Sequence, residues 1–256
     1  MRQTLDIPLS LALCGLPDPT GLRAQIDWAS GAGYRAVTLN AAAPESRARD
    51  LGRSARRDIA ALLRRRELAC AGLDLWLPPA HLTDPAHADR ALTALLDAVD
   101  LAADLAELTD GDAVVSTVLP DPKDAPGVAA ALLDRAAGRG AHIADHRWPL
   151  AENEPPPAPG APIGVGLDPA SMFIAEGKSC GPAAAVSRLA GAVISARLSD
   201  ADNAGRCVPG SPGGRLDALN YCVALTTAGY PRRLVIDVRG LSTPHDAAKR
   251  WVRPRD

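Results

Sequence analysis

The chain has 256 residues, of which 47% are hydrophobic and 23% are charged, and its formal net charge is −2. This length provides a substantial hydrophobic core and fits one large domain or two ordinary ones. The near-neutral charge argues against a general nucleic-acid binder, which would show a basic face, and no apolar run reaches the roughly 18 residues that a membrane-spanning helix needs.

Apolar, strand-like runs alternate with helical segments from one end of the chain to the other. The first run, from Ile7 to Cys14, follows Asp6 and is short for the hydrophobic region of a signal peptide. We therefore interpret it as the start of a strand rather than as a targeting segment. The predicted strands are Leu9–Cys14, Ala36–Asn40, Ala69–Leu75, Ala113–Leu119, His142–His146, Ile163–Asp168, Val193–Ser199 and Leu234–Val238.

The segments between these strands are amphipathic, with a period close to that of an α-helix. A glycine follows three of these segments, at the position where helices commonly end: Gly33, Gly140 and Gly229. The predicted helices are Thr20–Ala32, Ser54–Arg66, Ala88–Leu105, Pro126–Arg139, Gly181–Ala190, Leu216–Ala228 and His245–Val252.

Repetition of strand and helix predicts parallel strands joined by helical crossovers. Eight such units in about 250 residues are typical of a closed (β/α)8 barrel, the TIM barrel, here a single α/β domain over residues 1–256. A doubly wound open sheet is the alternative. It would be favoured by a G-x-G-x-x-G turn after the first strand, and Cys14–Thr20 contains none.

One crossover departs from this pattern. Between His146 and Ile163, five of the last eight residues are prolines. Proline lacks a backbone donor and has a fixed φ angle, so a helix is disfavoured there. The sequence predicts that a Pro-rich loop replaces the crossover helix between strands five and six.

The cysteines indicate the cellular compartment. They are odd in number and scattered, and no C-x-x-C pair occurs, so neither a disulfide framework nor a zinc knuckle is indicated. Free thiols in a reducing cytoplasm account for the pattern, and we expect a cytoplasmic protein.

Polar residues stand at the C-terminal ends of the predicted strands, where such barrels build their sites. Side chains alternate along a strand, so an inward Asp145 would place His142 and His146 outward or at the rim. Each aspartate could instead cap the following helix, and this alternative stays open. The strand-end residues are Asn40, Asp74, Asp145, Asp168, Arg197 and Asp237.

Several motifs resemble those of the xylose isomerase-like barrels, a group of sugar isomerases and epimerases that includes relatives of apurinic endonucleases. The segment GYRAVTLN resembles the family's second strand, and IADH resembles its fifth. The resemblance is strongest from Arg197 to Asp237, which contains RLSD, Arg206, PGSPGGRLD, ALNYCVALTTAGY and RLVID in the family's order.

The resemblance implies a metal site whose ligands have changed. Family members hold one divalent metal, commonly manganese or a similar hard cation, with Glu, Asp, His and Glu from strands five to eight. Thr38 and Ser171 also replace a family Glu and a family His. Carried over by position, the four ligands become Asp145, Asp168, Arg197 and Asp237.

The change from His to Arg197 differs in kind from the changes from Glu to Asp. A guanidinium is permanently protonated and has no lone pair for a metal. Arginine also forms bidentate pairs with carboxylates. We therefore hypothesise that Arg197 is a built-in cation that replaces the metal, with Asp145, Asp168 and Asp237 as its partners. The cofactor alternatives are a divalent metal held by these aspartates and no metal at all.

Three further residues are candidates for substrate binding. Arg206 resembles the family arginine that contacts substrate oxygens, although a solvated loop arginine is an equal alternative. Trp76 and Trp148 follow strands three and five, where aromatic walls often flank a sugar, and a packing role is their alternative.

Three functions remain open at this point. The first is a sugar or sugar-phosphate isomerase or epimerase, in which Asp145 and Asp237 transfer a proton between adjacent carbons of a ketose or aldose while a metal or Arg197 stabilises the enediolate. The second is a catalytically inactive barrel that binds a small polyol or a protein partner. The third is an endonuclease-type repair enzyme, which needs several His and carboxylate ligands for a multi-metal site, and this sequence lacks them. We expect a small sugar or polyol as partner, no nucleic acid and no membrane, and leave a homo-oligomer open.

Overall fold

The computed structural model describes residues 7–17, 21–150, 155–176 and 181–252. Eight parallel strands close into a barrel in the order β1-β10-β7-β6-β5-β4-β3-β2. This closure confirms the predicted TIM barrel and excludes the open sheet. The barrel strands are β1 (Leu9–Ala12), β2 (Ala36–Asn40), β3 (Ala69–Asp74), β4 (Val114–Thr117), β5 (His142–Asp145), β6 (Ile163–Leu167), β7 (Val193–Leu198) and β10 (Leu234–Ile236).

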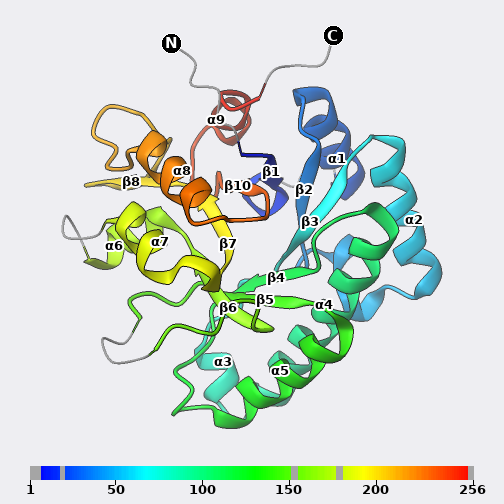
Figure 1. Ribbon diagram of the computed structural model, residues 1–256. Helices are drawn as coiled ribbons and strands as arrows, with labels where there is room; N and C mark the ends of the chain where they lie inside the picture. Colours follow the sequence, from blue (N-terminus) through cyan, green and yellow to red (C-terminus); the bar gives the residue numbers. More distant parts are fainter. Residues whose placement is uncertain (1–6, 18–20, 151–154, 177–180, 253–256) are drawn as a thin grey trace.

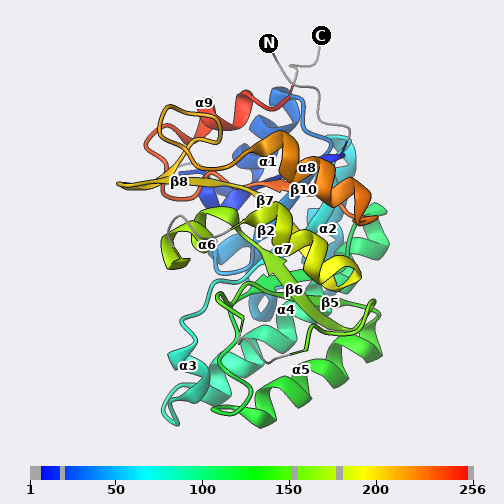
Figure 2. The same ribbon diagram turned by 60° about the vertical axis from the view of Figure 1, so that its left-hand side comes forward.

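Helices surround the barrel (Figures 1 and 2). Neighbours along the chain pack against each other, as α4 does with α5 and α7 with α8. Among the described residues, no helix combines the length and apolar character needed to cross a membrane. The helices are α1 (Gly21–Ala32), α2 (Arg53–Arg65), α3 (Ala80–Thr83), α4 (Ala88–Thr109), α5 (Pro126–Arg139), α6 (Pro169–Glu176), α7 (Pro182–Leu189), α8 (Ala218–Thr227) and α9 (Pro244–Lys249).

The helix α2 illustrates how the sequence produces this arrangement. Ile59, Leu62 and Leu63 recur at intervals of three and four residues and are buried, whereas Arg53 and Arg57 are exposed. Burying one aliphatic side chain of this size contributes about 1.5–3 kcal/mol. One stripe of the helix therefore packs on the barrel while its arginines face water.

A few buried side chains lie apart from the main core. Val114, Ala144 and Ile194 form a buried cluster separate from the main core. The hydroxyls of Ser116 and Ser195 lie 3.4 Å apart, although β4 and β7 are not neighbouring strands. Both side chains must therefore point into the barrel.

The short helix α3, the helix α6 and a hairpin of two strands were not predicted. The helix α6 begins directly after β6 and has only 8 residues, too few to show a clear period beside the longer pattern at Gly181–Ala190. The segment interpreted as a loop, Asp200–Arg215, contains an antiparallel hairpin of β8 (Asp200–Asp202) and β9 (Gly205–Cys207).

The crossover between β5 and β6 has no helix in the residues described, 146–150 and 155–162. Residues 151–154 lie outside the described part of the chain, so the complete Pro-rich loop stays a prediction. The described cysteines Cys14, Cys70, Cys207 and Cys222 are free thiols, and Cys180 lies outside the described residues.

Candidate functional site

The C-terminal end of the barrel is centred on Arg197. This side chain projects from β7 and is fully buried. Its Nη1 donates to Oδ2 of Asp237 at 3.1 Å, and its Nη2 donates to Oδ1 of Asp74. The register of β7 and β10 pairs Arg197 with Val235, which places Asp237 directly beyond the end of the neighbouring strand. Two strand ends, β3 and β10, thus supply the counter-charges.

Two more arginines complete the network. Arg206 lies 3.0 Å from Asp168 and 3.1 Å from Asp237. Arg239 contacts the same two carboxylates, at 3.0 Å for Asp168 and 2.5 Å for Asp237. We call the set of Asp74, Asp168, Asp237, Arg197, Arg206 and Arg239 the Arg–Asp cluster. Its three guanidiniums balance its three carboxylates.

The β8–β9 hairpin positions Arg206. One carboxylate oxygen of Asp200 accepts hydrogen bonds from the backbone nitrogens of Ala201 at 2.7 Å, Arg215 at 2.9 Å and Leu216 at 3.0 Å. Asp200 is itself buried. It therefore fixes both ends of the loop that carries Arg206.

Hydroxyl groups also donate hydrogen bonds to the carboxylate of Asp168. Ser199 donates to Oδ1 at 2.5 Å, and Ser171 donates to Oδ2 at 3.0 Å. Ser171 stands where the family pattern has a histidine, and it hydrogen-bonds the carboxylate. Hydrogen bonds to the ionised form stabilise that form.

Two guanidiniums lie over the ring of Trp76, which was expected to form an aromatic wall beside a sugar. The guanidinium carbon of Arg239 lies 3.9 Å from the centre of the indole ring, and that of Arg197 lies 4.7 Å from it. The ring of His146 meets Trp76 edge-on at 5.1 Å. A side chain at Gly166 would collide with this imidazole, so the glycine makes room for His146 inside the barrel.

The charges of the cluster hold its carboxylates ionised. Burial raises the pKa of Asp168, but Arg206, Arg239 and the hydrogen bond from Ser199 together outweigh burial, and the pKa falls to about 2. The pKa of Asp237 is also lowered, because Arg239 and Arg197 outweigh its burial. Burial lowers the pKa of Arg239, and Asp237 more than reverses this, so the net shift is upward.

Two neutral groups, the buried His146 and the half-buried Cys14, border the cluster. Burial, reinforced by Arg197, lowers the pKa of His146 well below its usual value, so the imidazole is uncharged. Burial and the nearby Asp74 raise the pKa of the Cys14 thiol, which donates to Asp74 at 3.0 Å. Neither group adds charge to the cluster.

The structure brings together five of the seven candidate residues from the sequence: Trp76, Asp168, Arg197, Arg206 and Asp237. It does not bring Asp145 or Trp148 to them. The expected partners of Arg197 need correction, because it pairs with Asp74 and Asp237, while Asp168 pairs with Arg206 and Arg239. Trp148 packs against the main core.

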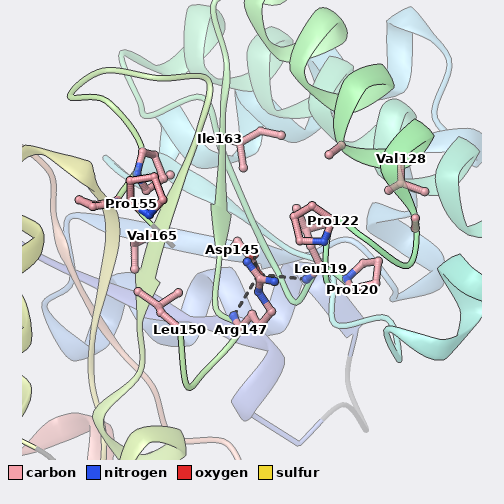
Figure 3. Close-up of a pocket in the computed structure, with 15 residues that line it drawn as sticks. Leu119, Pro120, Pro122, Val128, Asp145, Arg147, Leu150, Pro155, Ile163 and Val165 are labelled. Carbon is pink, nitrogen blue, oxygen red and sulfur yellow. Dashed lines mark hydrogen bonds and ion pairs between the residues drawn. The ribbon is translucent and has the colours of Figure 1, made fainter. Parts of the chain in front are cut away.

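The side-chain alternation on β5 is the reverse of the expected one. His146 points into the barrel, and Asp145 lines a cavity on its outer side together with Arg147, Leu119 and Pro155 (Figure 3). Oδ1 of Asp145 accepts from the backbone nitrogens of Leu119 and Arg147, both at 3.0 Å. Asp145 therefore organises the loop after β4 and lies apart from the Arg–Asp cluster.

Sequence reasoning missed Asp74, Arg239 and His146 as members of the site. Asp74 stood at a strand end but was not included, since the family pattern has no ligand there. Arg239 follows Asp237 by two residues, and an alternation of period two would have placed both on one face. No comparable signal marked His146, because the neighbouring Asp145 competed for the inward position.

The fold can be compared with solved structures. A xylose isomerase domain protein from Planctomyces limnophilus superposes with a TM-score of 0.71 and 16% identity, over 96% of this chain and 92% of that one. A D-psicose 3-epimerase structure in the presence of D-fructose gives 0.69 and 13%, over 95% and 94%. The IolI protein with a bound zinc atom gives 0.69 and 14%, over 96% and 95%.

The likeness to these structures is one of fold. It extends over nearly the whole of this chain and of these structures. No protein-family model matches the sequence, and no curated protein sequence matches it.

The residues at the C-terminal end of this barrel do not fit a divalent metal. A metal needs carboxylate or imidazole lone pairs, and guanidiniums, hydroxyls, a thiol and backbone groups already donate to the carboxylates of Asp74, Asp168 and Asp237. Among the described residues, no three His, Cys, Asp or Glu side chains are grouped to hold a metal ion. Arg197 lies between the carboxylates instead.

Proposed function

We propose that this protein is a metal-independent member of the xylose isomerase-like group that has lost proton-transfer chemistry and binds a small polyhydroxylated molecule. The observation that carries the proposal is the position of Arg197, which is fully buried and pairs with Asp74 and Asp237 at the barrel centre. In this proposal the guanidinium does the electrostatic work of the divalent cation, as a fixed charge among carboxylates.

The acid–base groups support the loss of catalysis. A general base works best when its pKa lies near the operating pH. The pKa of Asp168 is lowered to about 2, and that of Asp237 is lowered as well, so both are poor proton acceptors. Asp145, the other member of the expected proton-transfer pair, lies on the outer side of the barrel. The two carboxylates do not face one substrate.

The exposed edge of the cluster supports binding. The side chains of Arg206 and Arg239 are 18% and 23% exposed, whereas Arg197 is completely covered. Guanidinium N–H groups at this rim are hydrogen-bond donors that suit hydroxyl oxygens. The cluster carries no net charge, so a neutral sugar or polyol fits it better than a strongly charged ligand. We place this binding protein in a reducing cytoplasm because its described cysteines are free.

The test begins with metal analysis of protein purified without chelator, followed by thermal melts with added manganese, magnesium and zinc. We expect less than one metal per chain and no shift in melting temperature. Ketoses and aldoses are then incubated with the protein in deuterium oxide, and NMR follows exchange at the carbon beside the carbonyl. We expect no protein-dependent exchange.

Binding is measured in the same preparation by NMR titration with a series of sugars and polyols. We expect saturable binding that is weakened in Arg206→Gln and unchanged in the control Arg135→Gln, whose partner Asp100 lies away from the cluster. Stoichiometric metal with a melting shift that disappears in Asp168→Asn, or carbon-bound exchange that requires Asp237, would overturn the proposal and establish an isomerase.

A further inference from the structure

A cavity of about 470 Å³ lies beside the barrel, at the C-terminal ends of β2 and β3. Its walls come from the segment after β2, the segment after β3 and the N-terminal half of α4. We call this cavity the side pocket. Its floor is apolar and includes Leu75, Leu77 and Ala91, while its other lining residues include several arginines and two histidines.

The side pocket is separated from the Arg–Asp cluster by one extended segment. Asp74 and Trp76 face the cluster, whereas the alternate residues Leu75 and Leu77 face the side pocket. The backbone nitrogen of Leu75 donates to the carbonyl of Ser116 at 2.9 Å, which fixes this segment to β4. The two sites therefore share a wall but no side chain.

The opposite wall is also held in place. The guanidinium of Arg56 donates to the Leu51 carbonyl at 3.1 Å and to Asp104 at 2.7 Å. The hydroxyl of Ser46 donates to the carbonyl of Asn40 at 2.6 Å. Since both walls are anchored by hydrogen bonds to the barrel and its helices, the cavity is a pre-formed part of the fold.

The charge around the side pocket is predominantly positive. Arg47 and Arg49 share a single carboxylate, Asp50, at 3.3 and 3.6 Å. Arg90, in the first turn of α4, pairs with no carboxylate among the described residues and adds to the positive end of the helix dipole.

The histidines of the rim lie together, and the acids are few. The rings of His81 and His87 are 5.1 Å apart, and His87 has Asp84 at 3.8 Å. Asp97 is the one carboxylate among the side chains that line the cavity in the described chain. An anion therefore meets more opposite than like charge.

From this combination we propose that the side pocket binds a small-molecule anion with an apolar body, such as an aryl or alkyl phosphate or carboxylate. The apolar floor takes the body of the ligand, and Arg90 with Arg47 and Arg49 takes the anionic group. Pockets of this kind, with apolar walls and a few convergent polar groups, are the usual form of a small-molecule site. Planar guanidiniums pair with both phosphate and carboxylate oxygens.

The test is an isothermal titration of the full chain with four probes: phenyl phosphate, phenylacetate, inorganic phosphate and benzyl alcohol. We expect saturable binding of phenyl phosphate or phenylacetate, and the comparison of these two identifies the preferred anion. Inorganic phosphate lacks the apolar body and benzyl alcohol lacks the charge. Each should therefore bind at least about tenfold more weakly than the better aryl anion.

Variants locate the site. Arg90→Glu should weaken binding of the better aryl anion by about tenfold or more, and Arg49→Gln provides a second variant should Arg90→Glu fail to fold. Arg188→Glu, at an exposed arginine on α7, is the matched control and should bind as the unaltered chain does. Absence of saturable binding, equal weakening by Arg188→Glu, or loss in Arg239→Gln with none in Arg90→Glu would overturn the proposal.

Discussion

Arg197 and Asp237 are joined by a hydrogen bond of 3.1 Å between two side chains that are both 0% exposed. A charge in this position is stabilised by other protein groups, because water does not reach it. The same holds for Asp74 on the other side of the guanidinium. The stability of the barrel and the state of its site therefore depend on the same group.

Replacement of Arg197 is expected to destabilise the fold strongly. Arg197→Ala leaves the buried Asp74 without its guanidinium partner and removes one of the three guanidiniums that contact Asp237. Breaking a buried ion pair in this way costs about 3–5 kcal/mol. Urea unfolding measures the change in free energy. Arg188→Ala on the surface of α7 is the control and should change it by no more than about 0.5 kcal/mol. A comparably small effect of Arg197→Ala would contradict the role of the guanidinium as a built-in cation.

Acid should weaken the folded state through Asp168 and Asp237. Both carboxyls have a pKa below the ordinary value, so the unfolded chain binds protons more readily than the folded one. Their contribution is complete above about pH 5 and is lost as the pH falls toward 2. For Asp168, whose pKa falls from 3.8 to about 2, it is on the order of 2 kcal/mol.

The measurement is the free energy of unfolding from pH 7 to pH 2, in the unaltered chain and in Asp168→Asn. The variant cannot titrate at this position, so the difference between the two proteins should shrink as the pH falls. A difference that stays constant over this range would show that Asp168 has an ordinary pKa.

Gly166 is expected to tolerate no side chain while His146 is present. Gly166→Ala places a methyl group against the imidazole, and such overpacking costs about 1–3 kcal/mol. In the double variant Gly166→Ala, His146→Ala the collision is absent, so a thermodynamic cycle should give a favourable coupling between the two changes. Gly127→Ala in α5 meets no atom within 4 Å and should be neutral or stabilising.

Trp76 is expected to stabilise the fold through its aromatic face. Trp76→Ala removes the surface on which Arg239 and Arg197 lie and should cost about 3 kcal/mol. Trp76→Phe keeps an aromatic face for the two cations and should cost clearly less. Thermal and urea unfolding of both variants measure this order, and equal losses would contradict a stabilising role of the aromatic face.

The fold could be predicted from the sequence because its signal is repeated. Each unit has an apolar strand followed by an amphipathic helix, so an error in one unit, such as the missed α6, leaves the others intact. The barrel also gathers strand ends at one face, which explains why Asp168, Arg197 and Asp237 could be placed together before any coordinates existed.

The partners within the site could not be predicted in the same way. Successive side chains of a strand point to opposite faces, so an error of one residue in the expected alternation exchanges the inward and outward side chains. At the end of β5, both neighbouring positions are polar, Asp145 and His146. The glycine that accommodates His146 belongs to another strand. Arg239 was overlooked because it lies one residue beyond the predicted strand Leu234–Val238, and the alternation was not extended past that end.

Arg197 is part of the polypeptide, and this sets its site apart from any that holds a free ion. A bound metal is gained and lost with its concentration in the surroundings, so such a site exists in filled and empty forms. The guanidinium of Arg197 is covalently part of the protein, so every chain carries one. Because it cannot dissociate or be extracted by a chelator, the barrel centre has no apo form.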